Sequence, residues 1–300
     1  MHGWILLDKP LGLGSTQGVS AVKRALRDAG LPKLKVGHGG TLDPLATGVL
    51  PIAIGEATKL AGRMLDSDKV YDFTIAFGVE TDTLDLEGKP VATSDVRPTL
   101  AEVEAILPRF TGPIAQVPPA YSALKVDGER AYDLARAGEE VTLASRDVVI
   151  HALELTGSGQ YVDRPVVEEI DLQAHVSKGT YIRSLARDIA RALGSVGHVT
   201  RLRRIKAGPF TLDQAISLDK LGEAAKGRTL EQHLLPLRAG LDDIPALSLS
   251  PDQAGLLRQG RVLVGMHADD GHYFAQSGET PVALVEALSG EVRVVRGFNL

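Results

Sequence analysis

Apolar and polar positions follow two periods along this chain, and together they predict a mixture of strands and helices. Strand-like runs cover residues 4–7, 49–54, 70–77, 148–155, 167–176 and 199–205. Apolar residues at helical spacing predict one helix capped by Ser15 or Thr16 and another whose capping box is formed by Thr99 and Glu102. Further helices are predicted over 56–65, 129–137 and 180–193. Because strands and helices do not alternate strictly, we expect an α+β fold with a mixed, largely antiparallel central sheet flanked by helices.

A change of composition near residue 240 predicts two domains, covering residues 1–240 and 241–300. Pro236, Pro245 and Pro251 punctuate the chain there, and the balance of charge turns acidic beyond them. A short helix at 253–259 and strand-like runs at 262–264, 281–285 and 292–295 follow. This pattern is typical of a small β-rich module.

The composition is that of an ordinary globular protein, with 44% hydrophobic and 24% charged residues among 300. No apolar run approaches the roughly 18 residues of a membrane helix, and the N-terminus lacks the pattern of a secretory signal, so we expect a cytoplasmic protein. The chain has no cysteine, which excludes thiolate chemistry and disulfides. Its eight histidines are scattered without an i, i+4 pair, so we expect neither a metal nor a cofactor.

Positive charge is concentrated in one segment although the net charge is −5. Between Lys178 and Lys206 there is one acidic residue, Asp188, among eight basic ones: Lys178, Arg183, Arg187, Arg191, Arg201, Arg203, Arg204 and Lys206. Such a cluster could neutralise several phosphates of a nucleic acid. A solvated helix face followed by an exposed strand would give the same pattern.

The most unusual segment is the glycine-rich stretch from Val36 to Leu50, which contains four glycines and one proline around His38 and Asp43. Loops of this kind place side chains accurately and let a ligand approach the main chain. Asp43 could therefore take part in catalysis. It could equally cap the backbone of a tight structural turn.

Several motifs, this stretch among them, follow one another in an order that resembles the tRNA pseudouridine synthase B family, which modifies uridine 55 in the T arm of tRNA. They are Leu7–Gly12, Gly37–Pro51, Gly55–Lys59, Lys69–Tyr71, Gly78 with 81–85, Pro118–Lys125, Ser177–Arg183 and His198–Arg204. The resemblance covers roughly residues 3 to 240. Gly14 and Gly39 stand where many members have threonine, which affects local backbone and not the ionisable groups.

The resemblance implies a role for each matching residue. Asp43 would be the nucleophile, Tyr71 would stack on the target base and assist in removing its C5 proton, and Arg183 would pair with Asp43 and hold the carboxylate ionised and aimed. The positions that match substrate-contacting or RNA-facing residues are His38, Tyr181, Leu202, Lys9 and Lys125. The resemblance also implies the pseudouridine-synthase catalytic fold, a PUA-like RNA-binding module over 241–300, and tRNA as the partner of a monomeric enzyme.

Three other functions are less well supported by the residues. A dinucleotide site at Gly12, Gly14 and Gly18 would have its third glycine one place too far along, and lacks the expected acidic residue. A calcium loop at 82–87 lacks acids at alternate positions. A non-catalytic RNA-binding protein on the same scaffold stays open, because binding and chemistry are separable.

Overall fold

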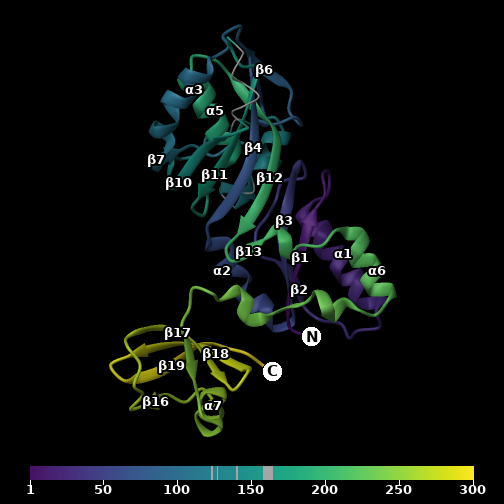
Figure 1. The fold of residues 1–300 in the computed structure, drawn as a ribbon, viewed down its shortest axis with the longest axis vertical. Coiled ribbons are helices and arrows are strands. Elements are labelled where there is room, and N and C mark those ends of the chain that lie inside the picture. Colours follow the sequence, from purple (N-terminus) through teal and green to yellow (C-terminus); the bar gives the residue numbers. More distant parts are fainter. Residues whose placement is uncertain (123, 127, 140, 158–164) are drawn as a thin grey trace.

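A ten-stranded sheet forms the larger part of the protein in a computed structural model, which describes residues 1–300 except 123, 127, 140 and 158–164 (Figure 1). Its main path runs β14-β1-β3-β12-β4-β11-β10-β7, with β13 beside β12 and β2 beside β3. The strands are β1 (Gly3–Lys9), β2 (Val36–His38), β3 (Ala46–Ile54), β4 (Lys69–Phe77), β7 (Gly112–Gln116), β10 (Arg146–Thr156), β11 (Glu169–Val176), β12 (Gly197–Ala207), β13 (Phe210–Thr211) and β14 (Leu235–Pro236).

Neighbouring strands of this sheet are antiparallel except β3 and β12, which are parallel. The predicted mixed, largely antiparallel sheet and the α+β class are therefore confirmed. The parallel pair lies in the middle of the sheet, so it brings the start of β3 next to β12, about 150 residues later in the chain.

The helices are α1 (Ser15–Asp28), α2 (Ala61–Asp66), α3 (Leu100–Ile106), α4 (Ala131–Arg136), α5 (Ile182–Ala192), α6 (Leu218–Lys226) and α7 (Pro251–Arg258). The predicted capping box of α3 is confirmed: the Thr99 hydroxyl accepts a hydrogen bond from the Glu102 amide, and the Glu102 carboxylate accepts one from the Thr99 amide. The expected cap of α1 is wrong: Gly14 occupies that position. The predicted helix over 56–65 is a 3-10 turn followed by α2, and α6 was not predicted.

Two buried clusters cover one face of the sheet and meet at Tyr71 and Leu202, which pack against both. One cluster joins β4, β11 and β12 to α5, and the other joins β1 and β3 to α1 and α6. α1 and α6 lie side by side, as Figure 1 shows. The two cores therefore flank the middle of the sheet, where the parallel strands begin.

The C-terminal part of the chain forms a second sheet, ordered β15-β17-β18-β19-β16, with α7 packed against it (Figure 1). Its strands are β15 (Ala246–Ser248), β16 (Leu263–Val264), β17 (Gly271–Ser277), β18 (Thr280–Leu288) and β19 (Glu291–Gly297). A third buried cluster joins this sheet to the first, because Phe274 and Phe298 share it with Trp4 and Phe210. The division at residue 240 stays a prediction, because buried contacts cross it.

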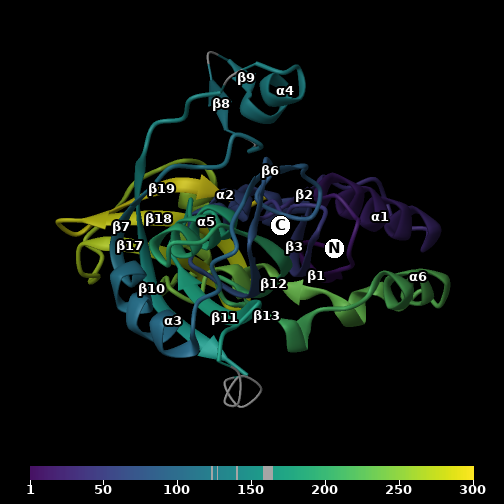
Figure 2. The same ribbon diagram turned by 90° about the horizontal axis from the view of Figure 1, so that it is seen from above.

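Two short hairpins complete the fold: β5 (Val79–Thr81) with β6 (Pro90–Thr93), and β8 (Lys125–Val126) with β9 (Glu129–Arg130). The second hairpin and α4 extend away from the rest of the molecule, as Figure 2 shows. The predicted helix over 129–137 therefore begins as a strand and is helical from Ala131. Among the described helices, none combines the length and apolar character needed to cross a membrane.

Candidate active site

Asp43 and Arg183 form an ion pair at the point where the two cores meet. The distance from Arg183 Nη2 to Asp43 Oδ2 is 2.9 Å, although 140 positions separate the two residues. The Arg183 side chain is 6% exposed and that of Asp43 is 40% exposed. The pair therefore presents a carboxylate to solvent while its cationic partner is fixed inside the protein.

The position of Arg183 is fixed by three further contacts. Its Nη1 donates to the Thr83 carbonyl at 2.8 Å, and its Nη2 to the Tyr121 carbonyl at 3.0 Å. The buried carboxylate of Asp85 lies 3.6 Å from Nη1. Arg183 belongs to the first turn of α5, which packs on β12 and β4. The guanidinium thus bridges two carboxylates, only one of which is open to a ligand.

Two buried cationic side chains form hydrogen bonds with the loop that carries Asp43 and with its neighbouring segments. Lys9 Nζ donates to the carbonyls of Pro10, Leu13 and Pro44 at 3.0, 2.6 and 3.2 Å. Arg204 donates to the carbonyls of Gly40, Thr41 and Val49 at 3.2, 3.3 and 2.8 Å. Both side chains are essentially inaccessible to solvent. Their hydrogen bonds satisfy carbonyls that an irregular loop leaves without secondary-structure partners.

Only glycine fits at position 48, where β3 meets β12. Its φ is +99°, and a Cβ at this position would lie 2.2 Å from the Arg204 carbonyl oxygen. A side chain would therefore force β3 away from β12 and move the start of β3, which follows Asp43. The interpretation of Asp43 as a plain structural cap does not account for its outward-facing carboxylate or for its bond to Arg183.

A narrow cleft of about 10 Å³ lies beside the ion pair. It is lined by Asp43, Leu45, Ala46, Asp85, Arg183, Val199, Thr200, Arg201 and Leu202. Leu202 lies opposite Ala46 on β3 and Phe73 on β4, so the parallel strand pair forms its floor. Tyr71 stands two residues from Phe73 on the same face of β4 and is half-buried.

Comparisons with known proteins identify the family of this chain. A profile described as "TruB family pseudouridylate synthase (N terminal domain)" matches residues 24–182, and one described as "tRNA pseudouridylate synthase B C-terminal domain" matches 183–242. The chain belongs to the TruB family of pseudouridylate synthases. The predicted family is therefore confirmed.

Curated relatives agree with this assignment. The "tRNA pseudouridine synthase B" of Novosphingobium aromaticivorans is 69% identical over all of this chain and 98% of its own length. That of Zymomonas mobilis is 62% identical over all of this chain and 96% of its own. A solved H/ACA ribonucleoprotein bound to a substrate RNA contains a chain with the same fold. Its TM-score is 0.73 at 21% identity, covering 99% of this chain and 85% of that one.

The other predicted site residues of this TruB family member lie at different depths. Tyr181 precedes α5 as its N-cap residue, and its backbone exchanges two hydrogen bonds with the Gln116 side chain. His38 ends β2, and its buried Nδ1 has no hydrogen-bond partner among the described residues. Burial and the nearby Arg204 charge lower the pKa of His38, so the ring is neutral at pH 7.

Of the two lysines expected to face RNA, the structure describes the side chain of Lys9 alone. Lys9 is inaccessible and its three donors meet backbone carbonyls, so it supports the Asp43 loop from inside. Burial lowers the pKa of Lys9 to about 8, although the negative charge of Asp43 acts in the opposite direction. Lys125 belongs to β8, and its side chain lies outside the described part of the structure.

Most cations of the basic cluster between Lys178 and Lys206 pair with acids, and all but one of these acids come from outside the cluster. The pairs are Lys178–Asp66, Arg183–Asp43, Arg187–Asp188, Arg191–Glu80, Arg201–Asp171 and Arg203–Asp8. Arg204 is buried against carbonyls. The local excess of positive charge counted along the sequence is therefore largely compensated in the fold, because such a count cannot include acids that folding brings in.

Sequence reasoning gave Asp85 no part in this site. The sequence places it in a family motif and in a poorly supported calcium loop, and the structure places it against Arg183 and the Thr83 hydroxyl. The presence of Asp85 in one motif with Thr81 and Thr83 was the sequence feature that could have identified it as a site residue. Thr81 binds the Asp85 carbonyl at 2.7 Å, which fixes the turn that presents the carboxylate.

Proposed function

We propose that this protein isomerises uridine 55 in the T loop of tRNA to pseudouridine, with Asp43 as the nucleophile. The observation that carries the proposal is the Asp43–Arg183 pair, in which a buried cation holds a solvent-facing carboxylate. The fixed guanidinium orients the carboxylate, which nucleophilic attack requires. The relatives named tRNA pseudouridine synthase B support the reaction and the class of RNA.

The reaction conserves the composition of the nucleoside. The bond from the sugar C1′ to N1 of uracil breaks, the base turns, and C1′ joins C5 instead. The C5 proton leaves and N1 gains a proton, so no oxidant or reductant is consumed. Asp43 would act as the nucleophile that allows the glycosidic bond to break, and Tyr71 would stack on the base and assist removal of the C5 proton.

A uridine within a folded loop must leave its stack to reach Asp43. A cleft lined by Asp43, Leu45, Arg183 and Leu202 lies beside the ion pair, and the flipped base would be placed over it.

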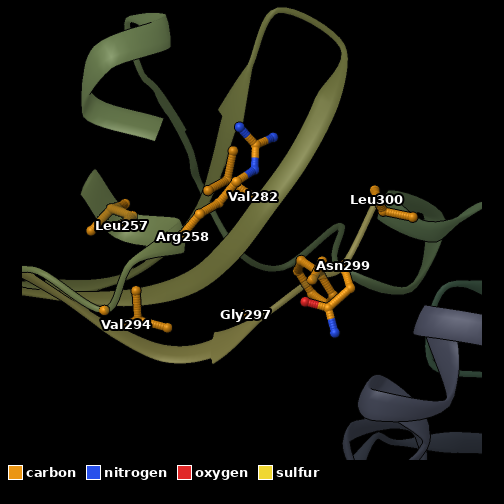
Figure 3. Close-up of a pocket in the computed structure, with 9 residues that line it drawn as sticks. Leu257, Arg258, Val282, Val294, Gly297, Asn299 and Leu300 are labelled. Carbon is orange, nitrogen blue, oxygen red and sulfur yellow. The ribbon is translucent and has the colours of Figure 1, made fainter. Parts of the chain in front are cut away.

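We further propose that residues 241–300 form a PUA-like module that binds RNA outside the target loop. A cavity of about 440 Å³ lies between α7 and the C-terminal residues, and Arg258 lines it, as Figure 3 shows. Arg258 is exposed, whereas Arg293 pairs with Glu291 at 2.7 Å. An exposed guanidinium on the rim of a hollow is suited to a phosphate. The RNA partner would then be held by a single chain acting as a monomer.

The decisive experiment measures tritium release from tRNA labelled at uracil C5. We expect release with the wild-type protein in buffer containing EDTA and no added cofactor, and none with Asp43→Asn, while the affinity of the variant for tRNA changes by less than about threefold. Binding by both proteins with release by neither would instead establish the non-catalytic alternative. Retention of a tenth of the wild-type rate by Asp43→Asn would refute the nucleophile assignment.

A further inference from the structure

On the face of the large sheet away from Asp43, two imidazoles and a carboxylate converge. Asp68 Oδ2 lies 3.1 Å from His151 Nε2 and 3.8 Å from His175 Nε2. The three candidate ligand atoms all lie within 4.8 Å of one another, and the two rings are 4.8 Å apart between centroids. The side chains are 37–48% exposed, so an ion in solution can reach them.

Strand alternation puts the two imidazoles on one face of the sheet. Ile150 is buried, so the next residue of β10, His151, points to the opposite face, where His175 also points because it follows the buried Ala174 on β11. The register with β11 shifts between Ile150 and Ala152, so His151 is the extra residue of a bulge and Leu153 returns to the buried face. Both imidazoles therefore lie on the face of the sheet away from the core that contains Ala174.

Asp68 is held in place by its neighbours on the chain. It precedes the first residue of β4, and its carbonyl accepts a hydrogen bond of 2.9 Å from the Gly208 amide. The adjacent Lys69 side chain donates to the Leu65 carbonyl at 2.7 Å and to the Ser67 carbonyl. Two of the ligands thus come from the neighbouring strands β10 and β11, and the third from the residue that leads into β4 beside them, which is a rigid support for a site.

We propose that Asp68, His151 and His175 bind one divalent transition-metal ion of the zinc class. Tetrahedral coordination at about 2.0–2.1 Å requires ligand atoms roughly 3.4 Å apart, between the two distances found here. Two imidazole nitrogens with one carboxylate select zinc, cobalt or nickel over magnesium and calcium, which prefer oxygen. Water would complete the coordination on the exposed side.

This site is separate from the active site. His175 faces away from the core that contains Ala174 and α5, while Arg183 approaches Asp43 from α5 itself. The ion would join the beginning of β4 to β10 and β11, so its effect would be on the stability of this end of the sheet. Tritium release should be the same in EDTA and in Zn²⁺, which makes the proposal independent of the proposed function.

Titration of the full-length, metal-stripped protein with Zn²⁺, followed by calorimetry, tests the proposal. We expect one Zn²⁺ per chain, unaffected by millimolar Mg²⁺, with an affinity at least about tenfold weaker in His151→Ala and in His175→Ala. His267→Ala, which removes an exposed histidine in the C-terminal part, is the matched control and should bind as wild type.

Two further readings separate the site from nonspecific binding. Co²⁺ should give the visible absorption of a four-coordinate ion with wild type and not with His175→Ala. Zn²⁺ should raise the Tm of wild type and leave that of the two variants unchanged, because the ligands meet only in the folded sheet. Equal Zn²⁺ affinity in wild type and His175→Ala, or no binding by either, would overturn the proposal and leave an ordinary His–Asp ion pair.

Discussion

Arg183 and Asp43 approach within 2.9 Å, with the arginine almost completely buried and the aspartate open to solvent. The arginine also bonds two backbone carbonyls and lies near Asp85, so its position is determined by the fold and not by the carboxylate alone. Because one guanidinium makes all these contacts at once, the geometry of the pair depends on the shape of this group as well as on its charge.

Arg183→Lys should therefore lower kcat by about a hundredfold or more, although the charge is kept. An ammonium is a single point donor and cannot reach Asp43, Thr83 and Tyr121 together, so the carboxylate loses its orientation. Single-turnover tritium release at saturating enzyme measures the effect. Arg191→Lys, eight residues along α5 and away from Asp43, replaces an exposed arginine that pairs with the buried Glu80; it is the matched control and should retain the wild-type rate. Equal rates for the two variants would contradict the role given to Arg183.

Lys9 should make the free energy of unfolding rise with pH above 8. Its pKa is about 8 in the folded protein, lowered by burial, and 10.5 is the ordinary value that the unfolded chain recovers. Between these values the unfolded state binds more protons, so stability increases as pH rises and the increment is lost as pH falls through 8. Wild type should gain about 2 kcal/mol more than Lys9→Met between pH 8 and 10.

Urea unfolding at several pH values provides this measurement. The pKa of Lys69 is also lowered to about 8 by burial, but Lys69 is present in both proteins and cancels in the difference. Parallel pH curves for wild type and Lys9→Met would show that Lys9 is solvated, as an RNA-contacting lysine would be.

Arg258→Ala should weaken tRNA binding and lower the slope of log affinity against log salt by about one. The exposed guanidinium lines the C-terminal cavity and would contact one phosphate. Single-turnover rates at saturating enzyme should stay near the wild-type value, since the ion pair of Asp43 is untouched. Arg293→Ala, whose partner is Glu291, is the control. An unchanged salt slope in Arg258→Ala would remove this residue from the RNA interface.

Phe298→Ala should destabilise the whole molecule by about 3 kcal/mol or more, because it opens a cavity in a cluster shared by both sheets. The single tryptophan, Trp4, lies in the same cluster and its fluorescence can follow urea unfolding. Leu300→Ala, at a residue that is 45% exposed, should change stability by less than about 0.5 kcal/mol. If Phe298→Ala leaves the Trp4 transition unmoved, the two parts of the chain unfold independently.

The sequence by itself determined the elements and the chemistry of the loop. Apolar periodicity located most strands of the large sheet, and the Thr99 cap was predicted because it depends on residues three positions apart. The motif around Asp43 and the motif containing Arg183 pointed to the family that the comparisons then confirmed. Each of these inferences rests on neighbours along the chain, where spacing alone fixes geometry.

Tertiary structure decided which charges meet. The sheet order β1-β3-β12 brings Asp8 to Arg203, and the packing of the molecule brings Glu80 of β5 to Arg191 of α5; each pair spans more than a hundred positions. The burial of Lys9 and the approach of His151 to His175 depend in the same way on which strands become neighbours. No local period encodes such pairings, because the energy of a charge depends on its partners in space and on how much water they exclude.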